Sequence, residues 1–159
     1  MIEPKHLLFK VIRPTLKALD LWSVPAERLV LGTAMQESAC GRYLIQLGGP
    51  ALGIYQMEPA THDDIWNNFL LYNSKLVDKL KQLMIADWAQ SEEVIGNLYY
   101  ATAMCRVHYL RVKSAIPDHL HGQADYWKAY YNTPLGKGTT ADYLNNWQQF
   151  NGSMILQDV

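Results

Sequence analysis

Apolar residues recur at intervals of three and four positions along nearly the whole chain, which is the spacing of helices that bury one face. No segment shows the strict apolar–polar alternation of a half-buried strand, although residues 43–56 could form a short hairpin. The pattern therefore predicts an all-α fold, or an α fold with a minimal β-hairpin.

The N-terminal part of the pattern predicts two helices. The first covers residues 5–21 and is bent or split at Pro14, because proline lacks the backbone N–H that a helix interior needs. The second covers residues 25–40, where Pro25 suits the first turn and Gly41 is a natural stop. We therefore expect a loop to begin directly after the second helix.

The middle of the chain begins with that loop and continues with three helices. Residues 41–57 are rich in glycine, which predicts irregular structure. Thr61 is expected to open a helix as the first residue of a capping box, and Ser74 is expected to cap the next helix. Ser91 is expected to open the longest helix, which Pro117 ends.

The C-terminal part predicts a helix, a turn and a last helix. The first of these helices covers about residues 123–131, and residues 133–138 form the turn. The last helix presents large apolar side chains at helical spacing: Tyr143, Leu144, Trp147 and Phe150.

Length and composition narrow the choice of architecture and partner. A chain of 159 residues suits one domain over residues 1–159, and its 49% apolar content is enough for a core. The net charge of −1, without a basic stripe, argues against a nucleic-acid partner. No stretch is long enough to span a bilayer, so no membrane span is expected.

Glu37 stands out among the acidic residues because it continues an apolar helical stripe. Val30, Ala34 and Glu37 lie at positions i, i+4 and i+7, on one face of a helix. The carboxyl group is also expected near the helix C-terminus, where the helix dipole disfavours negative charge. Both effects raise the pKa of a carboxyl group, which suits a general acid. The helix pattern alone favours an ordinary surface glutamate over a functional one, so the case for Glu37 depends on the sequence around it.

The sequence around Glu37 adds short motifs in a fixed order. Glu37-Ser38 ends the helix, Gly53-Ile54-Tyr55-Gln56 and Pro59-Ala60-Thr61 follow a loop, and Ala129-Tyr130-Tyr131-Asn132 ends a later helix. This order resembles the lytic transglycosylases and goose-type lysozymes of the lysozyme-like superfamily, in particular a phage-borne branch. Those proteins carry Glu-Ser, Gly-Leu-Met-Gln, Pro-x-Thr and Ala-Tyr-Asn-Ala-Gly. The resemblance covers about residues 25–145.

The resemblance implies a single lysozyme-like helical domain with a glycan cleft, and peptidoglycan as the substrate. Glu37 would be the single acid/base residue acting on the β-1,4 bond between N-acetylmuramic acid and N-acetylglucosamine. It would protonate the glycosidic oxygen and then take the proton of the muramic C6 hydroxyl, whose attack leaves a 1,6-anhydro end. Ser38 and Gln56 would bind substrate or orient the site.

Four further substrate-binding residues are implied by the resemblance. Tyr55 and Met57 would line the floor of the cleft, and Tyr131 and Asn132 would form its opposite wall.

Two departures from the family pattern bear on activity. Tyr55 is bulkier than the family's methionine, and Thr133-Pro134 replaces Ala-Gly, so the turn after Asn132 must differ in shape.

Three alternatives stay open beside the transglycosylase. A peptidoglycan hydrolase (a muramidase, or lysozyme) would use water and a second carboxylate. Glu58, Asp63 and Asp64 are candidates for that carboxylate, although Asp63 and Asp64 are better explained as helix caps. A non-catalytic virion structural or glycan-binding protein of the same fold is the second alternative. An unrelated helical interaction domain is the third.

Neither a cofactor nor a metal is expected. His108 with His119 and His121 lacks the carboxylate or thiolate that would complete a zinc-binding pattern. Cys40 and Cys105 both lie in apolar helical patterns, so buried free thiols are favoured over a disulfide.

The N-terminus and the resemblance together suggest a location. Charged residues interrupt the short apolar run of residues 1–10, so no signal peptide is expected. A protein that reaches the cell wall without one would be virion-associated, with virion or tail proteins as partners. It could also be made in the host cytoplasm and reach the periplasm or cell wall later. Either location fits a role in phage entry or lysis.

Overall fold

Helices take up most of the chain in the computed structural model, which describes residues 1–157. Within this range no β-strand forms, and the isolated bridges of Leu52 with Ile45 and with Met57 stand where a hairpin is expected. The prediction of an almost purely helical fold is confirmed. In chain order the elements are α1 (Pro4–Leu7), the π-helical turn η1 (Leu8–Ile12), α2 (Arg13–Ala18), α3 (Val24–Ser38), α4 (Pro59–Asp64), the π-helical turn η2 (Ile65–Phe69), the 3-10 turn η3 (Leu70–Tyr72), α5 (Ser74–Lys81), α6 (Glu93–Gly96), α7 (Leu98–Leu110), α8 (Leu120–Trp127), the π-helical turn η4 (Lys128–Asn132), α9 (Thr140–Gln149) and α10 (Gly152–Gln157).

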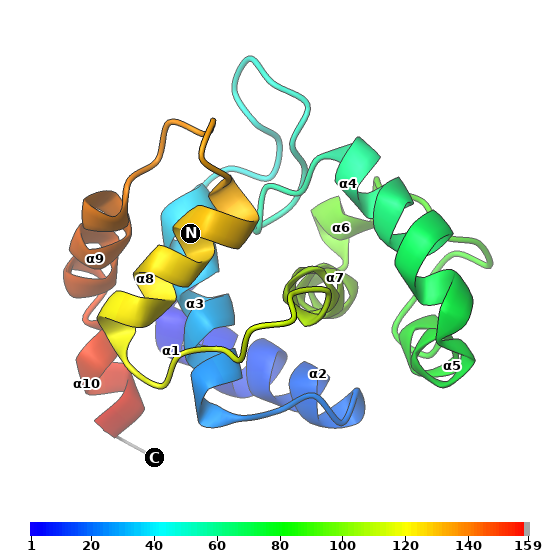
Figure 1. Cartoon of the computed structure of the whole chain (residues 1–159), viewed down its shortest axis with the longest axis horizontal. Coiled ribbons are helices and arrows are strands. Elements are labelled where there is room, and N and C mark those ends of the chain that lie inside the picture. Colours follow the sequence, from blue (N-terminus) through cyan, green and yellow to red (C-terminus); the bar gives the residue numbers. More distant parts are fainter. Residues whose placement is uncertain (158–159) are drawn as a thin grey trace.

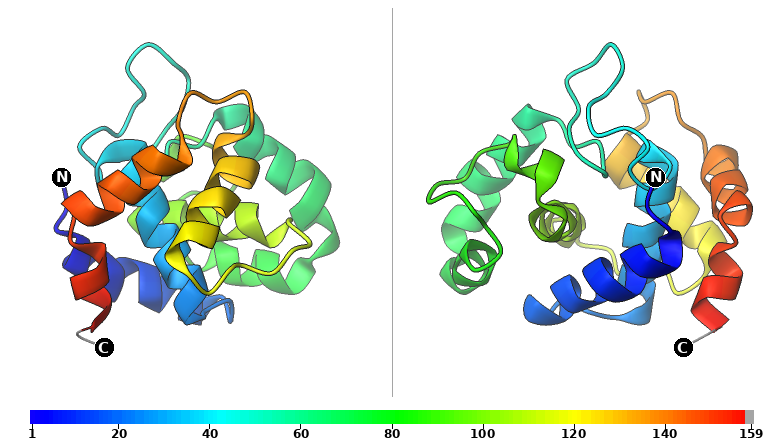
Figure 2. Two further views of the ribbon diagram at one scale, coloured as in Figure 1. Left: turned by 60° about the vertical axis from the view of Figure 1, so that its left-hand side comes forward. Right: turned by 180° about the vertical axis from the view of Figure 1, so that it is seen from behind.

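Helix α7 lies between two groups of helices (Figure 1). One group holds α4, η2 and α5, and the other holds α3, α8, α9 and α10. Seen from behind, the N-terminal run of α1, η1 and α2 lies across the base of the molecule, where it contacts both α3 and α7 (Figure 2). Helix α10 packs on α9 and α1, so the described residues form a single compact body.

Helix α3 is apolar on nearly every side because η1, α7, α8 and α9 all pack against it. Its closest neighbour is α9. At Gly32 a Cβ atom would lie 1.9 Å from the hydroxyl oxygen of Tyr143, so only glycine fits there. Six apolar side chains of α3 are at most 1% exposed: Ala26, Leu29, Val30, Leu31, Ala34 and Met35.

Pro14 interrupts the first helix, as predicted. The wider turn η1 precedes it, and α2 begins at Arg13. Proline offers no N–H to the preceding turn, and a π-helical turn is one way for a helix to absorb that loss.

Two helix starts differ from the prediction. Helix α4 begins at Pro59, so Thr61 lies inside the helix and forms no capping box. Proline is the stronger start signal here because its fixed φ suits the first helical turn. Asn73, rather than Ser74, caps α5, since its side-chain oxygen accepts a hydrogen bond from the N–H of Leu76 at 3.2 Å.

The long helix predicted to follow Ser91 is in fact two helices. The chain leaves the helical conformation at Asn97, between α6 and α7. The Asn97 side chain caps α7 by accepting a hydrogen bond from the N–H of Tyr100 at 3.0 Å. Helix α7 ends at Leu110, well before Pro117, so α3 with 15 residues is longer than α7 with 13.

Three polar residues have local roles that the pattern does not predict. His119 caps α8, because its Nδ1 atom accepts a hydrogen bond from the N–H of Gly122 at 3.0 Å. Asp63 and Asp64 lie at the end of α4 and are not N-terminal caps. Asp64 instead forms a 2.6 Å ion pair with Arg111 of the neighbouring helix, which ties α4 to the end of α7.

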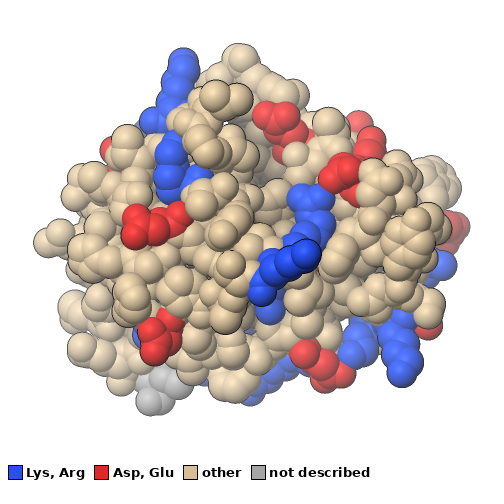
Figure 3. All heavy atoms as spheres, in the orientation of Figure 1, with Lys and Arg blue, Asp and Glu red and all other residues tan. Residues whose placement is uncertain are grey.

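Charged side chains are scattered over the face of the molecule seen in Figure 3 and do not gather into one basic or acidic patch. No helix within residues 1–157 combines the length and the apolarity needed to cross a membrane. Cys40 and Cys105 are buried and free, which confirms that prediction.

A buried ion pair joins α2 to the first turn of α3. The Glu27 carboxyl is 1% exposed and accepts hydrogen bonds from Nε and Nη2 of Arg13, at 2.7 and 2.6 Å. The indole N–H of Trp22 donates a third hydrogen bond to it at 2.7 Å. These three hydrogen bonds compensate the loss of water around the buried carboxylate. If the carboxylate is removed, the buried donors lose their acceptor, and this lowers the stability of the fold.

We expect Glu27→Ala to lower the free energy of unfolding by about 3 kcal/mol or more, because it leaves the Arg13 guanidinium without its partner. Urea unfolding followed by circular dichroism measures this change. Glu92→Ala removes an exposed carboxyl group and is the matched control, with an expected change within about 0.5 kcal/mol. Equal stability of the two variants would contradict the prediction.

Candidate active site

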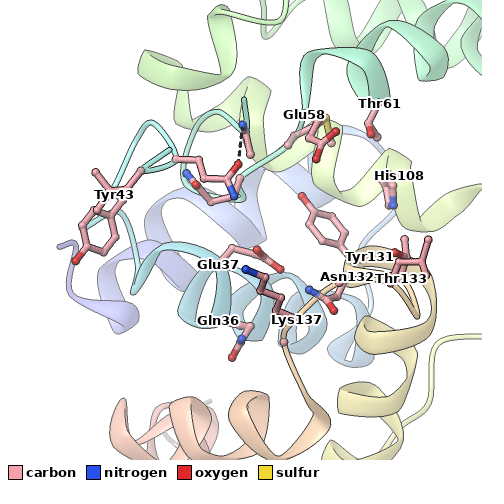
Figure 4. Close-up of a pocket in the computed structure, with 18 residues that line it drawn as sticks. Gln36, Glu37, Tyr43, Glu58, Thr61, His108, Tyr131, Asn132, Thr133 and Lys137 are labelled. Atoms are coloured by element: carbon pink, nitrogen blue, oxygen red, sulfur yellow. Dashed lines mark hydrogen bonds between the residues drawn. The ribbon is translucent and has the colours of Figure 1, made fainter. Parts of the chain in front are cut away.

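A pocket of about 830 Å³ opens at the C-terminal end of α3 (Figure 4). Its walls come from the end of α3, the loop over residues 41–57, the start of α4 and the loop over residues 133–138. Glu37, Gln56, Met57, Tyr131 and Asn132 all line it, so five of the seven predicted site residues meet in one place.

The Glu37 carboxyl enters this pocket from the last turn of α3. It is partly exposed to the pocket, and its Oε1 atom accepts a hydrogen bond from the indole N–H of Trp127 at 2.8 Å. Burial by the surrounding protein raises the pKa of Glu37 to about 7, and the Trp127 hydrogen bond opposes this rise. The raised pKa predicted from the apolar stripe is confirmed, and desolvation is its main cause.

Ser38 does not line the pocket, so of its two predicted roles, binding substrate or orienting the site, the structure favours the second. The side chain is 1% exposed because it ties the end of α3 to the following loop. Its Oγ atom donates a hydrogen bond to the carbonyl of Ile54 at 2.6 Å and accepts one from the N–H of Gly41 at 2.8 Å. Ser38 therefore orients the loop that carries Gln56.

Tyr55 also lies outside the pocket, contrary to its predicted place on the floor. Its ring is 2% exposed, and its hydroxyl pairs with that of Thr102 at 2.9 Å, inside the core. The next two residues do line the pocket. Gln56 adopts a left-handed backbone conformation, with φ of 47°, and this turns the chain from the core to the pocket wall.

The opposite wall comes from the end of η4. The Tyr131 hydroxyl donates a hydrogen bond to the carbonyl of Tyr55 at 2.8 Å, which joins this wall to the floor loop. The ring of Tyr131 packs edge-on against His108, with 4.8 Å between the ring centroids. Asn132 accepts a hydrogen bond from the Lys128 ammonium at 2.7 Å. Both residues share the pocket with Glu37 in Figure 4.

Sequence reasoning missed several residues of the site. Trp127 is completely buried and shows only as one of many apolar helical positions, so no local signal identifies it as the donor to Glu37. Glu58 is predicted only as a candidate second carboxylate of a hydrolase; it is exposed and lines the pocket across from Glu37 (Figure 4). Lys137 lines it from the loop over residues 133–138.

His108 is neutral in this environment. Burial lowers its pKa to about 4, and the nearby Arg111 adds to the fall. Its Nε2–H donates a hydrogen bond to the carbonyl of Tyr130 at 3.0 Å, while its Nδ1 atom accepts one from Arg111 at 3.0 Å. His108 therefore supplies a fixed, uncharged surface to the pocket.

The pocket thus combines a protonatable carboxyl group with a buried donor, and its walls are mostly amide, hydroxyl, aromatic and aliphatic groups. Such a site can donate a proton near neutral pH to a largely uncharged ligand. A search of protein-family models, curated proteins and solved structures finds no match to this chain.

We expect Trp127→Phe to raise the pKa of Glu37 further, because the indole N–H stabilises the ionised carboxyl group. The measurement is a ¹³C NMR titration of glutamate carboxyl groups, with Glu37 assigned through Glu37→Gln. Trp147→Phe is the matched control, since Trp147 is also buried but donates its N–H to Ser153. A Glu37 pKa that stays unchanged or falls in Trp127→Phe would contradict the assigned hydrogen bond.

The raised pKa of Glu37 also predicts a dependence of stability on pH. Between the ordinary pKa of 4.5 and about 7, the folded chain holds a proton on Glu37 that the unfolded chain has lost. Unfolding therefore releases a proton, and this group makes the fold less stable as the pH rises through that range.

Glu37→Gln keeps the shape of the side chain and removes the ionisation. We expect the variant to match the wild type at pH 4 and to be more stable at pH 8 by up to about 3 kcal/mol. Thermal and urea unfolding at both pH values measure the difference, with Glu92→Gln as the control for an exposed carboxyl group. A constant difference between variant and wild type at the two pH values would exclude a raised pKa.

Proposed function

We propose that this protein is a peptidoglycan-cleaving lytic transglycosylase. It acts on the β-1,4 bond between N-acetylmuramic acid and N-acetylglucosamine, with Glu37 as its single acid/base residue. The observation that carries the proposal is the Glu37 carboxyl, whose pKa is raised to about 7 in an open pocket. The motif resemblance points to the same residue and the same chemistry, and implies use in phage entry or lysis.

Glu37 performs two proton transfers in the proposed reaction. Its Oε1 atom accepts the Trp127 hydrogen bond, so Oε2 carries the acid proton. That proton passes to the glycosidic oxygen of the leaving N-acetylglucosamine as the bond to the muramic C1 breaks. The carboxylate then removes the proton of the muramic C6 hydroxyl, whose oxygen bonds to C1. The products are a free 4-hydroxyl group and a 1,6-anhydro end, and no water is consumed.

The other pocket residues suit a sugar. The amides of Gln56 and Asn132 offer neutral hydrogen-bonding groups, while Tyr43, Met57 and Tyr131 offer surfaces on which sugar rings can pack. The Trp127 N–H stabilises the carboxylate that Glu37 becomes midway through the reaction.

One observation favours the hydrolase as a second candidate function. Glu58 lines the same pocket and faces it from the side opposite Glu37 (Figure 4). A carboxylate in that place could activate a water molecule, as the second carboxylate of an inverting glycosidase does. The product would then carry a reducing end in place of the 1,6-anhydro end.

Muropeptide analysis tests the proposal. Purified protein is incubated with peptidoglycan, and the soluble products are identified by mass spectrometry. We expect 1,6-anhydro muropeptides from the wild type. Glu37→Gln should release them at a rate reduced by a factor of at least about a hundred, because the acid is lost. Glu92→Gln should cleave like the wild type. No product from the wild type, under conditions in which a control lysin works, would contradict the proposed enzymatic activity and leave the two non-catalytic alternatives.

Glu58→Gln separates the two reactions in the same assay. A transglycosylase keeps its 1,6-anhydro products in this variant, since the second carboxylate takes no part. A hydrolase gives reducing ends in the wild type and loses about a hundredfold or more in rate in Glu58→Gln.

A further inference from the structure

Lys137 stands at the mouth of the pocket on a turn that is held from two sides. On one side the Lys128 ammonium donates hydrogen bonds to the carbonyls of Thr133 and Gly136, at 3.0 and 2.8 Å. It also binds the side chain of Asn132. One half-buried ammonium group thereby binds three acceptors and fixes the course of the turn.

The glycines on either side of Lys137 hold the turn against the site. A Cβ atom at Gly136 would lie 2.3 Å from the carbonyl oxygen of Asn132, and one at Gly138 would lie 2.7 Å from the Trp127 ring. Neither position has room for a side chain. At Gly138 the backbone therefore packs directly on Trp127, the residue that donates a hydrogen bond to Glu37. Lys137 is the charged residue that this turn presents to the pocket (Figure 4).

The Lys137 ammonium has no acceptor of its own. In the part of the chain that the structure describes, no hydrogen bond or ion pair involves it, whereas Lys79 and Lys128 both have partners. The side chain is exposed and reaches over the pocket (Figure 4). A lysine on a fixed turn, without an internal partner, is available to a ligand in that pocket.

The charges around the pocket define which ligand group this lysine suits. Glu37 is neutral while it holds its proton, and His108 is neutral. Glu58 on the opposite side repels an anion. An anionic group of a ligand is therefore attracted to the Lys137 side of the pocket.

We infer that Lys137 binds a carboxylate of the substrate and so sets its specificity for glycan that carries acidic substituents. The inference rests on the proposed function. The sugar rings of peptidoglycan are neutral, and its carboxylates belong to the lactyl ether of muramic acid or to the attached peptide. Both sources offer the same group to the lysine, and a neutral polymer of N-acetylglucosamine offers none.

Binding to a catalytically blocked protein tests this inference, because the ligand then survives the measurement. Glu37→Gln, with and without Lys137→Gln, is titrated with three ligands at low ionic strength. The ligands are a neutral N-acetylglucosamine oligomer, a glycan oligomer with free lactyl carboxylates, and one with peptide attached. Lys75→Gln, which removes an exposed charge on α5, is the matched control.

We expect Lys137→Gln to raise the Kd about fivefold for a carboxylate-bearing ligand, the scale of one exposed charge pair, and to leave the neutral oligomer unaffected. Added salt should shrink the difference. A loss confined to the free-lactyl ligand assigns the lactyl carboxylate, and a loss confined to the peptide-bearing ligand assigns the peptide. In the active enzyme the same substitution should raise KM more than it lowers kcat.

Two results would overturn the inference. In the first, Lys137→Gln behaves like Lys75→Gln with all three ligands. In the second, it weakens the neutral and the acidic ligands equally, which would make Lys137 an ordinary sugar contact. In either case the wild type still binds and cleaves glycan, so the proposed function stands. If the wild type neither binds nor cleaves any glycan, the proposed function fails and this inference falls with it.

Discussion

The enclosure of α3 by η1, α7, α8 and α9 is the constraint on which the candidate site depends. Because most of this helix is buried in the core, Gln36 and Glu37 at its end lie where the surrounding helices leave an opening. The last turn accordingly brings Glu37 to the pocket. Ala39 and Cys40, with φ of 49° and 53°, then turn the chain sharply into the loop that forms the neighbouring wall.

Two glutamates on α3 have different surroundings, which suit the first to a structural role and the second to acid/base chemistry. Glu27, in the first turn, receives two hydrogen bonds from Arg13 and one from Trp22, so its negative charge is compensated where it is buried. Glu37, in the last turn, receives one hydrogen bond from Trp127 and pairs with no cation among the described residues. The first is therefore part of an ion pair, whereas desolvation without a cationic partner raises the pKa of the second to about 7.

Trp127 connects the parts of the site that come from distant segments. Its indole N–H fixes one oxygen of Glu37, and its ring leaves room only for a glycine at position 138. The ring thus holds the proposed acid by a hydrogen bond, and the turn that carries the proposed carboxylate-binding lysine packs on it through Gly138. A shift of this ring would displace both, which couples the packing of α8 on α3 to the geometry of the pocket.

The sequence by itself determined the helical class and most of the helices, because both follow from local spacing. It singled out Glu37 as a candidate through the order of short motifs around it. It also predicted that Gln56, Met57, Tyr131 and Asn132 would meet Glu37. Only the tertiary structure decided that Ser38 and Tyr55 turn into the core, that Trp127 is the donor, and that Glu58 and Lys137 reach the pocket. The reason is physical. Helical spacing shows which residues share a face. It does not show which neighbours a side chain meets, because these come from segments far away in the sequence, as with Trp127, which lies 90 positions from Glu37.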